Sequence, residues 1–148
     1  MDSMTIVWEE GEDQIRAVTA ETCLPLRHKV LWPHKPMDFS RVEGDEKADH
    51  YGYYHKGILV GCLGLFPQDP STERLRKFCV DTTFQGQGYG SHLLAVALKR
   101  AFDKPIYKVM AYARMDALPF YKNRGFQVVG QPFKKEEMLY SAIEILKA

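Results

Sequence analysis

Three glycines at alternate positions stand directly before an apolar helical segment, and they constrain the fold more than any other feature of this sequence. They are Gly86, Gly88 and Gly90, and the apolar segment covers residues 93–102. Glycine adopts backbone conformations closed to other residues and lets a ligand approach the main chain. Successive amide N–H groups can then join the unsatisfied donors at the start of the helix. The stretch therefore predicts either a tight strand-to-helix turn or a phosphate-binding loop.

Three phosphate-binding patterns compete for these glycines. A nucleotide P-loop needs a Lys and then a Ser or Thr after its last glycine, but Gly90 is followed by Ser91 and a histidine. The dinucleotide pattern G-x-G-x-x-G needs glycine at position 91 and a repeated βαβ unit, neither of which the sequence offers. The third pattern, Q-x-x-G-x-G, is matched by Gln85, Gly88 and Gly90.

Length and composition indicate one globular domain over residues 1–148. The chain is 45% hydrophobic and 26% charged, which is typical of a globular protein. A formal net charge of +1 predicts no broad basic surface, so we expect no nucleic-acid partner. The acidic N-terminus does not resemble a signal peptide. No segment approaches the roughly 20 apolar residues that cross a membrane, so no membrane contact is expected.

The three cysteines are too few, and of the wrong parity, for a disulfide framework. They are Cys23, Cys62 and Cys79. This favours a reducing compartment, and we expect a cytoplasmic protein.

Hydrophobic periodicity predicts a mixed α/β order around one sheet. We expect strands over residues 5–8, 51–55, 58–66, 75–80, 106–113, 126–129 and 138–146, and helices over 13–31, 93–102 and 116–123. Pro25 is expected to split or kink the first helix, and Gly125 is expected to end the last one. One face of the middle helix should be buried, through Leu94, Ala97, Leu98 and Ala101. Residues 32–49 should form a long exposed connection.

Two motifs together resemble the GNAT family of acetyl-coenzyme A-dependent N-acyltransferases. Residues 75–91 resemble its central coenzyme-binding motif. Residues 117–126, with Phe120-Tyr121 followed by Gly125-Phe126, resemble its second hallmark at the expected spacing. The resemblance implies the GNAT fold of the α/β class, a mixed and mostly antiparallel central sheet flanked by helices. The layout of the first half is most similar to the ElaA-type branch.

The resemblance also implies how acetyl-CoA, the acetyl donor, is held. Main-chain groups of Phe78, Cys79 and Val80 would bond the pantetheine arm, and a bulge there would offer an N–H to the acetyl oxygen. The pyrophosphate would bind the glycine stretch, which consists of Gln85, Gly86, Gln87, Gly88, Tyr89, Gly90 and Ser91. Many family members carry an Asn seven residues before the tyrosine of the second motif. Here that residue is Arg114, which either contacts the coenzyme or faces solvent.

Tyr121 matches the family tyrosine that acts as general acid toward the coenzyme thiolate. A phenol and an alkyl thiol have pKa values close enough for proton sharing. The alternative is a packing tyrosine at a helix end. A general base is not identified. Glu73, Asp81 and His50 are suitably placed in sequence, but such residues are more often surface charges or hairpin polar groups.

Cysteine and histidine suggest no further chemistry. Cys79 stands beside the implied thioester, but no His or Asn can be linked to it from sequence, and buried cysteine is commonly a small apolar residue. His50 and His55 are five positions apart, on opposite faces of a continuous strand. We therefore expect no metal site.

The chain is thus predicted to transfer acetyl from acetyl-CoA directly to a primary amine, most simply that of a small molecule, in a ternary complex. A coenzyme-binding module with lost or regulatory activity is the alternative, and a nucleotide-phosphate enzyme is a third class. The amine acceptor would carry a carboxylate or another anion if the region of Arg27, His28, Trp32, His34 and Lys35 faces the acceptor; otherwise these residues face solvent. A homodimer is compatible with the family.

Overall fold

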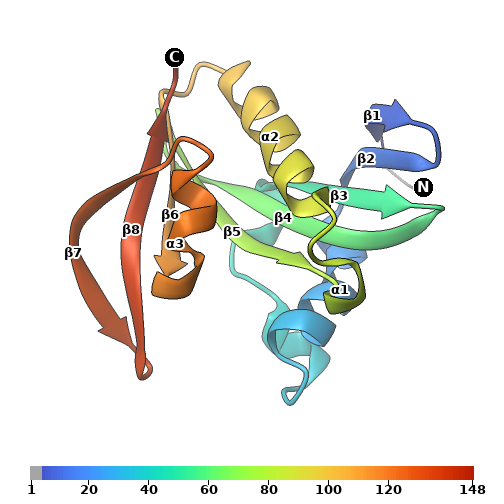
Figure 1. The fold of residues 1–148 in the computed structure, drawn as a ribbon, viewed down its shortest axis with the longest axis horizontal. Coiled ribbons are helices and arrows are strands. Elements are labelled where there is room, and N and C mark those ends of the chain that lie inside the picture. Colours follow the sequence, from blue (N-terminus) through green and yellow to red (C-terminus); the bar gives the residue numbers. More distant parts are fainter. Residues whose placement is uncertain (1–4) are drawn as a thin grey trace.

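One mixed sheet of eight strands organises the chain. The computed structural model describes residues 5–148 (Figure 1), and its strand order is β1-β2-β3-β4-β5-β6-β8-β7. The strands are β1 (Thr5–Glu10), β2 (Asp13–Val18), β3 (Asp49–His55), β4 (Ile58–Asp69), β5 (Thr72–Val80), β6 (Lys108–Arg114), β7 (Gln127–Lys135) and β8 (Met138–Leu146). All neighbouring pairs are antiparallel except β5 and β6. The predicted mixed and mostly antiparallel sheet is confirmed.

The helices cover the two faces of this sheet. They are α1 (Ala20–Leu31), α2 (Tyr89–Phe102) and α3 (Leu118–Lys122), with four short 3-10 helices, η1 (Met37–Ser40), η2 (Asp45–Lys47), η3 (Thr82–Phe84) and η4 (Met115–Ala117). Leu63 of β4 packs in one core cluster with α2 and α3, whereas its neighbour Cys62 packs in a second cluster with α1. Because successive side chains of a strand point to opposite faces, α1 and α2 lie on opposite sides. None of the helices in residues 5–148 is long and apolar enough to cross a membrane.

Most predicted elements are present, including the hairpin of β3 and β4 and the buried face of α2. Leu94, Ala97, Leu98 and Ala101 are at most 9% exposed. Gly125 follows α3 at a φ of +95°, as a helix stop requires.

The predicted helix over residues 13–31 is wrong in its first third. Residues 13–18 form β2, which pairs with both β1 and β3. Ile15 and Val18 are buried there, and Thr19 then caps α1 by accepting a hydrogen bond from the Thr22 amide. The predicted split at Pro25 is also wrong. The helix continues through it to Leu31, because burial of Leu24 and Leu26 outweighs the loss of one hydrogen bond.

The connection between α1 and β3 folds onto a buried ion pair. Arg27 is 1% exposed, and its guanidinium donates two hydrogen bonds, of 2.9 and 3.0 Å, to the Asp45 carboxylate. Burial opposes ionisation of Asp45, but the bonds from Arg27 outweigh it and lower the pKa of this carboxyl. Arg27 is therefore neither a surface residue nor part of an acceptor site, and the sequence expectation for it is wrong.

The sheet divides between its two parallel strands. β5 and β6 are paired only from Thr72–Arg74 to Lys108–Met110, and beyond these residues they diverge (Figure 1). β5 also carries a bulge, since Cys79 faces Cys62 and Arg76 faces Gly64, which leaves one extra residue in β5. Lys77 lies in the bulge at a φ of +55°. The division opens a space between the ends of the two strands.

Candidate active site

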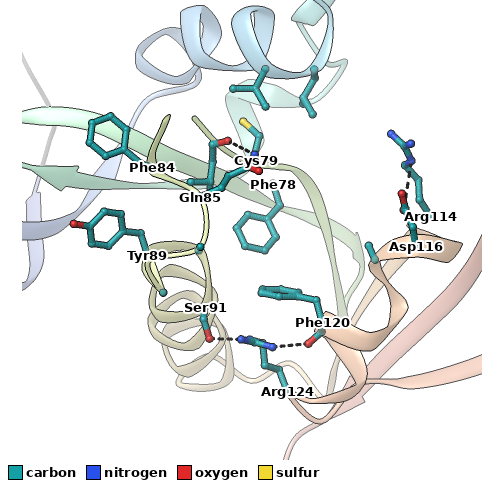
Figure 2. Close-up of a pocket in the computed structure, with 17 residues that line it drawn as sticks. Phe78, Cys79, Phe84, Gln85, Tyr89, Ser91, Arg114, Asp116, Phe120 and Arg124 are labelled. Atoms are coloured by element: carbon teal, nitrogen blue, oxygen red, sulfur yellow. Dashed lines mark hydrogen bonds and ion pairs between the residues drawn. The ribbon is translucent and has the colours of Figure 1, made fainter. Parts of the chain in front are cut away.

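A cleft of about 880 Å³ occupies the opening between β5 and β6. The end of α1, the end of β5, the glycine stretch and the η4–α3 segment form its walls (Figure 2). Every residue predicted to contact the coenzyme lines it except Gln87. The structure thus brings the strand end Phe78–Val80, the stretch Gln85–Ser91 and Arg114 to one place.

The glycine stretch is shaped as the sequence suggested. Gly86 and Gly88 have φ values of +80° and +85°, and Gly88 is the N-cap of α2. No side chain caps α2, so the first amide donors of this helix are left for a ligand. A Cβ at position 90 would lie 3.0 Å from Cγ2 of Val80, which is closer than most Cβ contacts in proteins. Close packing therefore favours glycine at this third position as well. The stretch combines left-handed backbone, free amides and a helix dipole, which suit an anionic group.

Gln85 has a structural role at this site. Its side-chain amide donates a 3.0 Å hydrogen bond to the carbonyl of Val80 (Figure 2). The bond ties the glycine stretch to the end of β5, and so fixes the distance between the two predicted coenzyme-binding segments.

Arg124 is a site residue that the sequence reasoning missed. Its Nε donates a 2.7 Å hydrogen bond to Oγ of Ser91, and a terminal nitrogen donates to the carbonyl of Phe120 at 2.8 Å (Figure 2). Its guanidinium also stacks 3.9 Å from the centre of the Phe120 ring. Arg124 has no carboxylate partner among residues 5–148, so its charge lies free beside the start of α2. Its position directly before Gly125 in the second motif is the sequence feature that could have indicated a place in the site.

Arg124→Gln is expected to weaken acetyl-CoA binding about tenfold, because a charged hydrogen-bond donor beside the predicted pyrophosphate-binding stretch is lost. The matched variant Arg114→Gln should weaken it less. Arg114 lines the cleft on the side away from Ser91, 55% exposed, with its Nε 3.8 Å from Asp116 (Figure 2). Titration calorimetry with acetyl-CoA measures the affinity of both variants. No loss of affinity for Arg124→Gln, or a larger loss for Arg114→Gln, would contradict this role of Arg124.

Tyr121 packs beside the cleft rather than in its wall. Its ring meets those of Phe78, Phe120 and Phe126 at centroid distances of 6.4, 5.2 and 5.4 Å. Phe78 and Phe120 line the cleft, whereas Tyr121 does not. Burial raises the pKa of Tyr121 to about 12, and no hydrogen bond contributes to that shift. The phenol therefore stays neutral near pH 7, with a proton to donate.

None of the three candidate bases lines the cleft. Glu73 is bonded to Lys104 at 2.6 Å, at the other end of β5. Asp81 is bonded to Lys29 at 2.8 Å and caps η3. His50 is buried beside Arg27, and burial lowers its pKa.

Cysteines, histidines and the α1–β3 connection add no further reactive group. Cys79 lies 3.7 Å from Cys62, thiol to thiol. Across residues 5–148 no cluster of three or more His, Cys, Asp or Glu residues could hold a metal ion. His28, Trp32, His34 and Lys35 do not line the cleft; Trp32 packs on Phe39, and His28 bonds the Lys35 carbonyl.

Comparison with known proteins identifies the family. The model of the acetyltransferase (GNAT) domain matches residues 29–146, and the chain belongs to this family. The chain is 24% identical over 128 residues to the uncharacterized N-acetyltransferase YitI of Bacillus subtilis, covering 81% of this chain and 86% of YitI. It is 30% identical over 102 residues to the spermine/spermidine N(1)-acetyltransferase of Bacillus subtilis, covering 59% and 67%.

Solved structures share the fold. A GNAT acetyltransferase from Elizabethkingia anophelis with acetyl-CoA bound has a TM-score of 0.71 at 20% identity, over 93% of this chain and 99% of that one. ElaA from Escherichia coli has a TM-score of 0.74 at 18% identity, over 90% and 98%. The predicted GNAT fold is confirmed, and ElaA is among its structural neighbours. The chain is an acyl-CoA-dependent N-acyltransferase.

Proposed function

We propose that this enzyme transfers acetyl from acetyl-CoA to the primary amine of a small molecule by direct attack in a ternary complex. The observation that carries the proposal is the cleft between β5 and β6. It joins the bulged end of β5, the uncapped start of α2 and the ring cluster of Tyr121. An acyl donor with an anionic end fits this combination.

The donor would lie across the cleft from the strand end to the glycine stretch. Main-chain groups of residues 78–80 would bond the pantetheine arm, because β5 has no strand partner on the side of β6 here. The pyrophosphate would meet the free amides of Gly88 to Ser91, with Arg124 beside them. The thioester would then lie near the bulge, where a backbone N–H stabilises the oxyanion.

The chemistry needs a neutral amine and an acid for the leaving sulfur. The amine nitrogen attacks the thioester carbon, the C–S bond breaks, and the electron pair leaves on the coenzyme sulfur. Tyr121 gives its proton to that thiolate, and the proton lost by the attacking nitrogen restores the phenol through solvent. A phenol with a pKa of about 12 remains protonated until this step.

Direct attack is favoured over an acyl-enzyme by the setting of Cys79. Its thiol packs against that of Cys62 in the α1 core cluster, and among residues 5–148 no imidazole is hydrogen-bonded to it. A nucleophilic cysteine needs an adjacent base or cation to form thiolate. Cys23, Cys62 and Cys79 are all free thiols.

An assay of thiol release tests the proposal. The purified chain with acetyl-CoA and a panel of small amines should release free coenzyme A only when a suitable amine is present. Coenzyme binding with no release across the panel would support the alternative, a binding module without activity. Stabilisation by ATP and not by acetyl-CoA would contradict both.

A further inference from the structure

A second cavity, of about 670 Å³, lies along the same division of the sheet. We call it the basic cavity. On β5 it is lined by residues 74–77, directly before the cleft residues 78–80, and on β6 by Tyr112, two positions before Arg114 of the cleft. β7 and β8 close it with Phe133, Lys135 and Tyr140. The basic cavity is therefore next to the place where the thioester would lie.

Its charges are of one sign. The basic cavity contains Arg74, Arg76, Lys77 and Lys135, three aromatic residues and no acidic residue. Within the described chain, none of these four cations forms an ion pair with a carboxylate. Arg74 stacks on Tyr112 at 4.7 Å and Arg76 on Phe66 at 5.6 Å. Four cations thus line one cavity without a carboxylate partner among the described residues, in a protein with a net charge of only +1.

Two further observations show that the basic cavity suits an anion. Nε of Arg74 is buried and has no hydrogen-bond partner, and such a group in a native protein calls for an explanation. Burial, and then the charge of Arg76, lower the pKa of both Arg74 and Lys77. An anion in the basic cavity would satisfy the free donor and relieve this repulsion.

We propose that the acceptor is a small primary amine that also carries a carboxylate or phosphate, and that Arg74 and Arg76 bind this anionic group in the basic cavity. This inference rests on the proposed function. A guanidinium forms paired hydrogen bonds with either anion. Tyr112, Phe133 and Tyr140 add aromatic surface to the lining, which suits an apolar part of the acceptor. The cavity volume is that of a small-molecule site.

The same cations also affect how the attacking amine loses its proton, a step for which no general base was identified. A positive surrounding disfavours an ammonium and lowers its pKa, so more of the amine is present as the neutral nucleophile. No carboxylate of the cleft or the basic cavity is then needed to hold the proton at the outset. A polyamine, with several positive charges and no anion, is the acceptor type that this cavity opposes most strongly.

Matched pairs of amines test the proposal. Phenylalanine is compared with phenethylamine, phosphoethanolamine with ethanolamine, and spermidine serves as the polycation. In at least one pair the member that carries the anionic group should have a kcat/KM at least about tenfold above that of its partner without that group. The pair that responds identifies carboxylate or phosphate. The proposal would be overturned by a preference for spermidine or by equal kcat/KM values within both pairs. Better turnover of an acidic peptide than of any small amine would also overturn it.

Single substitutions test which residues of the basic cavity bind the anionic group. Arg76→Gln should lower kcat/KM about tenfold for the amine that carries the anionic group, lower it much less for the partner amine without that group, and leave the acetyl-CoA affinity unchanged. Lys135→Gln, in exposed β7, should give a smaller loss in the same direction. Lys134→Gln, one residue away and outside the cavity, is the matched control. Equal effects of Lys135→Gln and Lys134→Gln, with none of Arg76→Gln, would contradict the assignment.

A binding measurement separates this inference from the proposed function. Calorimetric titration of N-acetylphenylalanine and of inorganic phosphate into the protein with coenzyme A should show binding that Arg76→Gln weakens about tenfold. If no amine is acetylated but this binding is present, the proposed function fails and the anion site stands. If amines are acetylated but neither anion binds, the anion site fails and the proposed function stands.

Discussion

Tyr121→Phe is expected to lower kcat about 100-fold and to leave acetyl-CoA binding nearly unchanged. A positioned general acid contributes roughly 10²- to 10⁴-fold, and the variant removes only the hydroxyl. The ring contacts with Phe78, Phe120 and Phe126 remain, so the packing beside the cleft should persist. Steady-state kinetics with a competent amine gives kcat, and calorimetry gives the coenzyme affinity.

Tyr107→Phe is the matched control, because this tyrosine is 56% exposed. Its kcat should equal that of the unmodified enzyme. The pKa of about 12 for Tyr121 adds a pH expectation. Loss of the phenol proton would remove the acid only near that pH, so kcat should show no fall from this group between pH 7 and about 10. Full activity of Tyr121→Phe would make this residue a packing tyrosine.

Asp45→Asn is expected to lower the free energy of unfolding by about 3 kcal/mol, since breaking a buried ion pair leaves an uncompensated charge. Arg27 is 1% exposed and would keep its charge without the carboxylate that accepts two of its hydrogen bonds. For a chain of this size the Tm should fall by about 10 °C. Thermal and urea unfolding followed by circular dichroism measure the change.

Glu21→Gln is the control, because Glu21 pairs with Arg41 at the surface and exposed pairs contribute little. The pH dependence has a definite sign. The pKa of Asp45 is lowered by folding, so its contribution is present above the ordinary pKa of 3.8 and is lost as the pH falls through the lower folded value. Asp45→Asn should therefore be less sensitive to acid. A Tm equal to that of Glu21→Gln would show that the pair is not important for stability.

The glycine stretch could be predicted because its determinants are local. Positive φ at Gly86 and Gly88, and the start of α2, depend on residues next to one another in sequence. The hairpin of β3 and β4 was likewise visible from its turn and its apolar runs. The short strand β2 was harder to predict. β2 has six residues and an irregular apolar pattern, and pairing with β1 and β3, rather than its own periodicity, makes it a strand.

Contacts between distant segments could not be predicted. Arg27 and Asp45 are joined across a loop, and nothing in either segment indicates burial of an arginine. Arg124 reaches Ser91 of α2 from the turn that follows α3. The basic cavity is assembled from β5, β6, β7 and β8, and its position depends on the point at which β5 and β6 diverge. The sequence reasoning linked an anionic acceptor to Arg27, which is paired with Asp45, whereas Arg74 and Arg76 of the basic cavity have no carboxylate partner among residues 5–148.

Mass spectrometry of a reaction with isotopically labelled acetyl-CoA tests direct transfer. The enzyme is incubated with the labelled coenzyme, with and without phenylalanine or another competent amine, and the small molecules and the intact protein are weighed. We expect the label on the amine nitrogen of the acceptor, and a protein mass unchanged in both samples. A labelled protein that forms without the amine and passes its label to the amine when it is added would contradict direct attack.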